Sequence, residues 1–284
     1  MRIADLLARG RTYSFEFFPP KTEEAEAQLT ATITELAPLK PSFFSVTYGA
    51  GGSTRTRTRD VVVNMARNGS VPPMAHLTCV GHTRDDINSL LGEYKAGGVE
   101  NILALGGDLP ADPSQAGSSD FRFALDLVEH VQAHFDMSIG VAAHPEVHPR
   151  STSREADRRH LAEKLRRADF AMTQFFFEAH HYLRLRDELV ALGVHKPIIP
   201  GIMPVTNKGQ IVKMAQMSGA EIPRWLTDRL EPLTESAEIR RVGVEVATKL
   251  AEELLAADVP GLHFYTLNRS TATREIYRNL GLGR

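Results

Sequence analysis

The run Tyr13-Ser-Phe-Glu-Phe-Phe18 is followed, after two prolines and a short turn, by a longer segment at Glu23–Leu39. The run is short and rich in aromatic residues, which favours a β-strand. The longer segment places apolar residues three and four positions apart, which favours an amphipathic helix. A strand followed by a helix is the repeating unit of folds with a parallel sheet. The rest of the chain can be divided into units of the same kind.

Eight strands are predicted, with helices between them. The strands are Tyr13–Phe18, Phe43–Tyr48, Met74–Val80, Asn101–Gly106, Ser138–His144, Phe170–Phe177, Pro197–Met203 and Leu262–Leu267. The main helices are Glu23–Leu39, Asp60–Asn68, Asp85–Ala96, Phe121–Phe135, Ser153–Arg167, His180–Leu192, Lys208–Met217 and Ala237–Ala256. Two further short helices are expected at Pro223–Leu230 and Thr271–Leu280. This alternation predicts the α/β class and a single (β/α)8 TIM barrel over residues 1–284, a length that suits one such domain.

The composition argues against nucleic acid and membranes as partners. The formal net charge is −2, and 42% hydrophobic with 24% charged residues is the balance of a soluble globular protein. The sequence has no basic patch that would bind a phosphate backbone. Charge interrupts the start of the chain too early for a signal peptide, so we expect a cytoplasmic protein. The single cysteine, Cys79, is expected to be a buried structural thiol.

The carboxyl ends of the strands are where a barrel of this kind carries its active site. Two polar residues stand out there because they interrupt apolar runs: Glu16 in Phe-Glu-Phe-Phe and Gln174 in Thr-Gln-Phe-Phe-Phe. A buried carboxyl group loses hydration, which favours its neutral form and suits a general acid. Two other interpretations stay open. Glu16 could form an ion pair with Arg269, and Gln174 could be a structural amide.

Other polar groups follow the strand ends. Gly106-Gly-Asp108 combines a tight backbone with a carboxylate, and His144-Pro-Glu-Val-His148 projects three polar side chains from a loop stiffened by proline. With His76 and Asp108, the two histidines of that loop could bind a divalent metal ion, as in a metal-dependent barrel hydrolase. The cationic segment Thr54–Arg59 could contact a phosphate or a polyglutamate tail, or could simply be solvated.

Eight motifs occur in order along the chain: Ser14-Phe-Glu-Phe-Phe-Pro-Pro-Lys21, Ser45-Val-Thr-Tyr-Gly-Ala50, His76-Leu-Thr-Cys79, Gly107-Asp-Leu-Pro110, Pro145-Glu-Val-His-Pro149, Thr173-Gln-Phe-Phe-Phe177, Ile199-Pro-Gly-Ile202 and His263-Phe-Tyr-Thr-Leu-Asn-Arg269. In this order and spacing they resemble the methylenetetrahydrofolate reductase family, in its bacterial form that consists of the catalytic domain alone. The resemblance spans nearly the whole chain. It implies a (β/α)8 barrel that reduces 5,10-methylenetetrahydrofolate to 5-methyltetrahydrofolate, a step of one-carbon metabolism and methionine biosynthesis.

The resemblance also implies roles for individual residues. Glu16 corresponds to the general acid of the family, and Asp108 to a second catalytic residue that contacts the pterin. The other folate-binding positions are Gln174, Gln210 and Arg269. The positions around the family's FAD and the nicotinamide are Thr47, His76, Ala124, His144, His148, Asp157, Lys164 and Met214. No residue is assigned to a metal ion.

Departures from the family pattern cluster at the flavin. Gly106 stands where an arginine is usual, His144 where a tyrosine is usual, and Met214 where an aromatic residue is usual. Phe123 and His160 also differ from the common residues, whereas the folate positions are unchanged. We therefore expect NADH or NADPH, with NADH favoured, to pass hydride directly to the folate without tightly bound FAD.

The sequence leaves three alternative functions open. One is the ordinary FAD-dependent reductase, in which the same reaction passes through the flavin. The second is the metal-dependent barrel hydrolase, and the third is a non-catalytic protein that binds folate. The folate is the expected small-molecule partner, and a homo-oligomer is compatible with the sequence.

Overall fold

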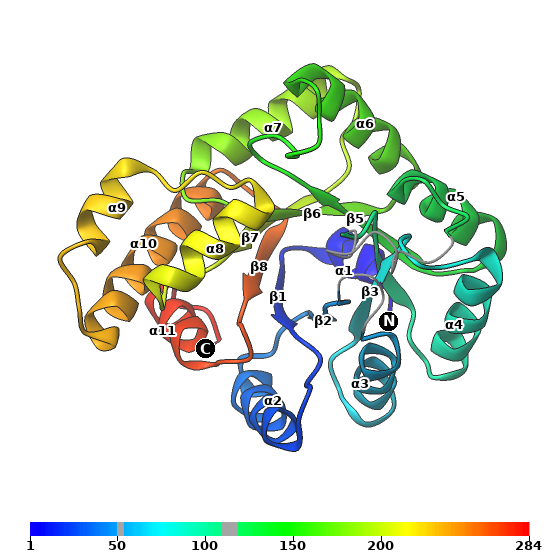
Figure 1. The fold of residues 1–284 in the computed structure, drawn as a ribbon, viewed down its shortest axis with the longest axis horizontal. Coiled ribbons are helices and arrows are strands. Elements are labelled where there is room, and N and C mark those ends of the chain that lie inside the picture. Colours follow the sequence, from blue (N-terminus) through cyan, green and yellow to red (C-terminus); the bar gives the residue numbers. More distant parts are fainter. Residues whose placement is uncertain (50–53, 109–118, 284) are drawn as a thin grey trace.

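Eight parallel strands close into a barrel in the computed structural model, which describes residues 1–49, 54–108 and 119–283 (Figure 1). The strands lie side by side in chain order, and the last pairs with the first. Their bounds are β1 (Thr12–Phe17), β2 (Phe43–Val46), β3 (Pro73–Thr78), β4 (Asn101–Leu105), β5 (Ser138–Ala143), β6 (Phe170–Phe175), β7 (Ile198–Ile202) and β8 (Gly261–Tyr265). The predicted (β/α)8 barrel is therefore confirmed. Each strand ends one or two residues earlier than predicted, where the chain leaves the sheet for a loop.

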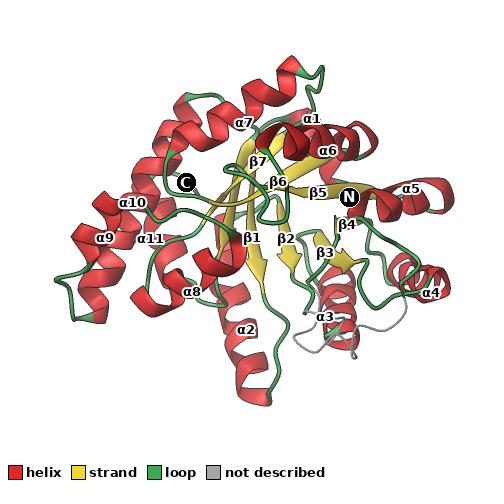
Figure 2. Cartoon of the chain, turned by 45° about the horizontal axis from the view of Figure 1, so that its top comes forward, coloured by secondary structure: helices red, strands yellow, loops and turns green. Residues whose placement is uncertain are grey.

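Helices surround the strands (Figure 2). Those that follow strands β1 to β6 are α2 (Glu23–Leu36), α3 (Arg55–Asn68), α4 (Arg84–Ala96), α5 (Ala124–His134), α6 (Arg154–Arg167) and α7 (Ala179–Ala191), and a 3-10 turn, η1 (Ala37–Leu39), extends α2. After β7 come α8 (Lys208–Ser218), α9 (Arg224–Leu230) and α10 (Ser236–Ala256), and α11 (Thr271–Asn279) follows β8. Helix α4 is capped at its N-terminus, because the Thr83 side chain accepts from the backbone N–H of Asp86 and the Asp86 carboxylate accepts from that of Thr83.

A short helix before the first strand, α1 (Ile3–Arg9), is absent from the sequence prediction. Its seven residues are too few for a clear periodic pattern. Tertiary contacts hold it instead: the backbone N–H of Ile3 donates to Asn101 Oδ1 (2.7 Å), and that of Ala4 donates to Ser138 Oγ (3.2 Å). The Ile3 side chain is fully buried in the apolar cluster inside the barrel.

The third helix starts earlier than predicted. The sequence pattern places its beginning at Asp60, but α3 begins at Arg55. The arginine-rich segment is helical because two side chains three positions apart have partners: Thr58 is buried and its hydroxyl donates to Thr47 O (2.9 Å), and Arg55 pairs with Asp86 (2.9 Å). The cationic segment is thus the first turn of a helix that packs on the barrel.

Side chains alternate along each strand between the inside of the barrel and its helical coat. The outward residues Phe15 and Phe17 of β1 pack in the core beneath the helices, together with Leu29 and Leu36 of α2. The lower inside layer is apolar and consists of Ile3, Phe43, Met74, Leu103, Phe170, Met172 and Ile199. Nearer the carboxyl ends of the strands, the inward positions become polar, and this is where the candidate site begins.

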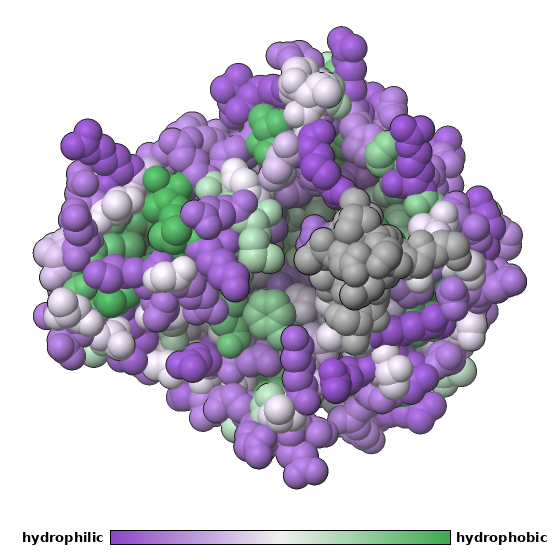
Figure 3. Space-filling view, in the orientation of Figure 1, coloured by the Kyte–Doolittle hydropathy of each residue, from purple (hydrophilic) through white to green (hydrophobic). Residues whose placement is uncertain are grey.

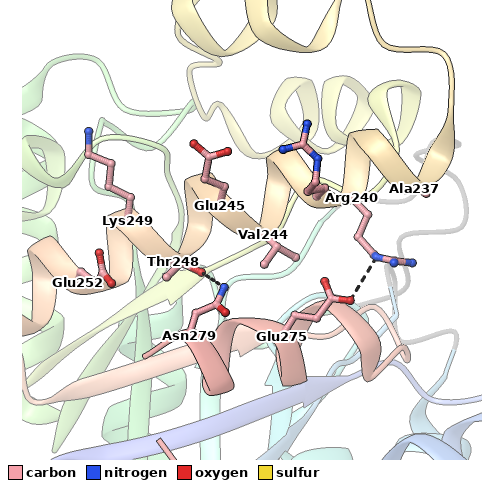
Figure 4. Close-up of a pocket in the computed structure, with 10 residues that line it drawn as sticks. Ala237, Arg240, Val244, Glu245, Thr248, Lys249, Glu252, Glu275 and Asn279 are labelled. Carbon is pink, nitrogen blue, oxygen red and sulfur yellow. Dashed lines mark hydrogen bonds and ion pairs between the residues drawn. The ribbon is translucent and has the colours of Figure 1, made fainter. Parts of the chain in front are cut away.

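The surface seen in Figure 3 is mostly hydrophilic, and its hydrophobic residues gather mainly on the side of α8, α9 and α10. A groove of about 820 Å³ lies on the outside of the barrel between α10 and α11 (Figure 4). Its lining carries both signs of charge, and Arg240 lies 3.6 Å from Glu275 across it. The groove is made by helices alone, away from the strand ends, so we do not assign it to the active site. None of the described helices is both long and apolar enough to cross a membrane.

Candidate active site

Glu16 lies inside the barrel, near the carboxyl end of β1. Its side chain is almost fully buried, with 6% of the residue exposed. Two histidines from other strands approach it: His263 Nε2 lies 3.2 Å and His76 Nε2 lies 3.4 Å from the carboxyl group. Both contacts end on the same oxygen, Oε2. Arg269, in contrast, is exposed, so the alternative of an ion pair between Arg269 and Glu16 is wrong; imidazoles are the partners in this structure.

Two serines complete a hydrogen-bonded row around this carboxyl group. Ser14 Oγ lies 2.8 Å from Nδ1 of His263, and Ser45 Oγ lies 2.7 Å from Nε2 of His76. Strand register explains the row, because Ser14 is paired with His263 and Glu16 with Ser45. Burial lowers the pKa of His76 to about 4, so this imidazole is neutral at pH 7.

Tyr265 stands beside the row, on the same face of β8 as His263. Its hydroxyl donates to Thr173 O (2.7 Å) on β6, and burial raises the pKa of the phenol well above its usual value. Gly201 makes room for the ring, since a Cβ there would lie 2.6 Å from Tyr265 Cε2. Gln174, the last residue but one of β6, is half-buried, and its Oε1 accepts from the N–H of Phe175 (3.2 Å).

The remaining predicted folate residues lie at the rim. Asp108 and Arg269 are exposed, and each lies just beyond the carboxyl end of a strand. Residues 109–118 of the loop after Asp108 lie outside the described residues. Gln210 is exposed in the first turn of α8 and lines a small cleft together with Met214. The rim thus brings polar groups from the ends of several strands around the opening above Glu16.

The loop between β5 and α6 is held by one arginine that the sequence did not single out. The Arg158 guanidinium is buried and donates to three consecutive backbone oxygens, those of His144 (3.1 Å), Pro145 (2.8 Å) and Glu146 (3.0 Å). It also pairs with Asp157 and Glu188. Three consecutive carbonyls on one guanidinium fix the path of the loop. No local pattern marks Arg158, because α6 carries many arginines.

Three of the positions expected around a flavin, His144, His148 and Asp157, contact one another. The His144 and His148 rings lie 4.5 Å apart, and Asp157 accepts from the N–H of His148 (3.2 Å). Lys164 Nζ donates to Ala142 O (2.9 Å), and burial lowers the pKa of this amine to about 8. Ala124 is buried at the start of α5, and Thr47 is half-buried after β2.

Three of the residues that were noted as departures from the family pattern, Phe123, His160 and Gly106, have defined contacts in the structure. The Phe123 ring meets the His160 ring edge-on, with centroids 5.5 Å apart. Beside Gly106, Arg150 Nη2 lies 3.9 Å from the point that a Cβ would occupy, and it donates to Gly107 O (3.4 Å). A guanidinium from the β5–α6 loop therefore lies beside Gly106, the position just after β4 where the resemblance leads us to expect an arginine.

The residues of the hydrolase alternative are not gathered into a metal site. His76 points to Glu16 inside the barrel, whereas His144 and His148 contact each other in the β5–α6 loop. Over the described part of the chain, the one group of three or more candidate ligands that lie within 4.8 Å of one another is Glu178, His180 and His181. Cys79 is a free, buried thiol, as predicted, and burial raises its pKa to about 12.

Comparison with known proteins identifies the family. The family model described as methylenetetrahydrofolate reductase matches residues 2–281. The 5,10-methylenetetrahydrofolate reductases of Pectobacterium carotovorum subsp. carotovorum and Escherichia coli (strain K12) are both 40% identical to this chain over 271 residues, and that of Salmonella typhimurium is 41% identical. Each alignment covers 95% of this chain and 90% of the relative.

A solved structure supports the fold. An uncharacterized protein from Clostridium thermocellum, described as binding two copies of 5-methyl-5,6,7,8-tetrahydrofolic acid, superposes with a TM-score of 0.70. The match covers 98% of this chain and 96% of that one, at 16% identity. The likeness shows the fold alone, while the sequence relatives and the family model agree over nearly the whole chain. The chain belongs to the methylenetetrahydrofolate reductase family.

Proposed function

We propose that this protein reduces 5,10-methylenetetrahydrofolate to 5-methyltetrahydrofolate with NAD(P)H, and that NADH is the preferred donor. The observation that carries the proposal is Glu16, a buried carboxyl group whose Oε2 faces the imidazoles of His76 and His263. Both contacts use one oxygen, which leaves Oε1 for the substrate. A carboxyl group fixed in this way at a barrel mouth is suited to deliver a proton to a bound molecule.

The chemistry requires such a proton. The bridging methylene of the substrate is held between two nitrogens and accepts hydride poorly. Protonation of one nitrogen by Glu16 breaks its bond to the methylene carbon and leaves an iminium ion. Hydride from C4 of the nicotinamide then adds to the iminium carbon, which gives the methyl group and the oxidised nicotinamide. The overall reaction consumes one proton and one hydride.

The folate residues have roles that follow from their chemistry. We assign Asp108 to the pterin, where its carboxylate accepts hydrogen bonds and places negative charge near the forming cation. Gln174 offers a donor and an acceptor to the pterin edge. Gln210 and Arg269, both exposed at the rim, suit the more distant part of the folate. These assignments rest on the position of each residue around the mouth and on the family motifs.

We further propose that hydride passes directly from the nicotinamide to the folate. The residues at the flavin positions fit a tightly bound FAD poorly, because their polar atoms already have protein partners: Lys164 Nζ donates to Ala142 O, and Asp157 accepts from His148 and Ser151. The His144 and His148 rings likewise contact each other. Direct transfer needs only that donor and acceptor carbons reach near-attack distance.

One observation favours the FAD-dependent alternative. Arg150 supplies a guanidinium beside Gly106, where the family pattern has an arginine. Two measurements separate the routes: the visible spectrum of freshly purified protein, and NADH oxidation in the presence of methylenetetrahydrofolate with and without added FAD. Direct transfer predicts that the spectrum shows no stoichiometric flavin band and that added FAD does not stimulate NADH oxidation. A stoichiometric flavin band would refute it.

The same assay tests the remaining alternative, a folate-binding protein without catalysis, which predicts folate binding but no NADH oxidation. We propose that residues 1–284 act as one catalytic domain in the cytoplasm, with the folate as small-molecule partner and without nucleic acid or membrane partners. A homo-oligomer is compatible with this proposal, and light scattering of the purified chain measures it.

A further inference from the structure

A cluster of metal-ligating side chains lies at the start of α7, outside the residues used in the proposed reaction. Glu178 is the N-cap residue of this helix, and His180 and His181 belong to its first turn. Their ligand atoms lie within 4.8 Å of one another, and the two imidazole rings lie 4.0 Å apart. Because β6 ends at Phe175, the cluster lies on the mouth side of the barrel, four residues beyond Gln174.

We propose that Glu178, His180 and His181 bind one divalent transition-metal ion of the zinc class, with water completing the coordination. Two imidazoles and one carboxylate are a ligand set that zinc accepts in tetrahedral sites with an open position. Imidazole nitrogen favours zinc, nickel, copper or cobalt over calcium and magnesium, which prefer oxygen. The side chains are exposed or half-buried, so small rotations bring the ligand atoms to the spacing of about 3.3 Å that a tetrahedral ion requires.

The carboxylate of Glu178 is already oriented. Its Oε1 accepts a hydrogen bond from the indole N–H of Trp225 on α9 (3.2 Å), and its Oε2 lies 3.9 Å from His181 Nε2. Trp225 therefore occupies one oxygen and directs the other toward the histidines. Outer hydrogen bonds of this kind fix carboxylate ligands in metal sites.

The surrounding charges favour a cation. The carboxylates of Glu178 and of Glu221, in the connection between α8 and α9, favour a positive charge at His181. The Arg154 guanidinium of α6 disfavours it. The backbone N–H of Glu221 donates to Glu146 Oε1 (3.1 Å), which brings a third carboxyl group nearby.

The chain carries its own reporter for this site, because Trp225 is its only tryptophan. The test uses the full-length chain without a histidine tag, freed of metal with a chelator. Co²⁺ is titrated while the Trp225 fluorescence and the visible absorption of the ion are followed, and Zn²⁺ is then added as competitor. We expect saturable quenching, a cobalt absorption band of the tetrahedral type, and reversal of both by Zn²⁺.

Variants distinguish this site from others. His180→Gln and His181→Gln should each weaken Co²⁺ binding at least tenfold, and the double variant should abolish the saturable phase. His195→Gln removes an exposed histidine outside the cluster and should leave binding unchanged. Trp225→Phe should lose the fluorescence signal but keep the cobalt band. Metal-free NADH oxidation should be normal in all four single variants.

Three results would overturn the proposal. The first is quenching that does not saturate, and the second is saturable binding that persists in the His180→Gln, His181→Gln double variant. The third is binding that is lost instead in a His144→Gln, His148→Gln double variant, which would place the ion in the β5–α6 loop. Circular dichroism of each variant verifies that the fold is intact.

Discussion

The barrel interior around Glu16 and the β5–α6 loop both border the mouth, but they are held by different means. Around Glu16, side chains from β1, β2, β3 and β8 contact one another because strand pairing places them side by side. The β5–α6 loop depends on the Arg158 guanidinium, which binds backbone oxygens. Sites built on strands are held more precisely than sites built on loops. The residues around Glu16 therefore depend on strand pairing, whereas the β5–α6 loop depends on a single side chain.

The largest effect is expected from Glu16→Gln. The amide keeps the shape of the side chain but cannot deliver the proton, so turnover should fall by about 10³-fold or more, at the upper part of the range for general-acid catalysis. Folate binding should stay within about tenfold of the unchanged protein. The measurements are NADH oxidation with methylenetetrahydrofolate and the equilibrium binding of folate. Near-normal turnover would exclude Glu16 as the acid.

The second effect tests whether register-fixed partners position this acid. His263→Leu removes the imidazole that lies 3.2 Å from Oε2 and should lower kcat by about 10- to 100-fold, because a small misplacement of a reacting group is costly. His263→Gln restores a polar group near the position of Nε2 and should recover part of kcat. KM for folate should change little in either variant. Equal losses in the two variants would show that His263 acts only as packing.

The third effect is the change in the free energy of unfolding with pH, and the lowered pKa of His76 determines its direction. The pKa of His76 is about 4 in the folded protein, against 6.5 for the free side chain. Between these values the unfolded chain binds the proton more tightly, so the free energy of unfolding falls as the pH drops from 6.5 to 4. At 1.36 kcal/mol per unit, His76 alone contributes a loss of about 2 to 3 kcal/mol by pH 4.5.

Urea unfolding at pH 7 and pH 4.5 measures this effect, with His76→Gln as the matched variant. Other groups also titrate in this range, so the quantity of interest is the difference between the two proteins. The unchanged protein should lose more stability on acidification than His76→Gln does. Equal losses would mean that protonation of His76 carries no folding penalty.

The sequence predicts the site around Glu16 better than it predicts the β5–α6 loop. Glu16 interrupts an apolar run, and the alternation of side chains along a strand turns it inward with Ser14. His263 could not be assigned the same way, because its contact with Ser14 joins residues 249 positions apart and depends on the pairing of β8 with β1. The motif that contains His263 supports the family, but it carries no information on which strand lies beside it.

The β5–α6 loop and the first helices show a different limit. Arg158 is one arginine among several on α6, and only the folded loop reveals that its donors meet three backbone oxygens. The helix α1 is too short for a periodic signal, and the start of α3 depends on contacts of Thr58 and Arg55 with other elements. Tertiary contacts decide such short segments, and local patterns do not contain them.

We propose above that the nicotinamide gives its hydride directly to the folate. The most direct test is turnover with NADH that carries deuterium at both C4 positions, in ordinary water, followed by mass spectrometry of the methyltetrahydrofolate. Direct transfer predicts one deuterium in each new methyl group. A route through a flavin exchanges the label with solvent before the second transfer. An unlabelled methyl group would therefore exclude direct hydride transfer, while a singly labelled one would support it.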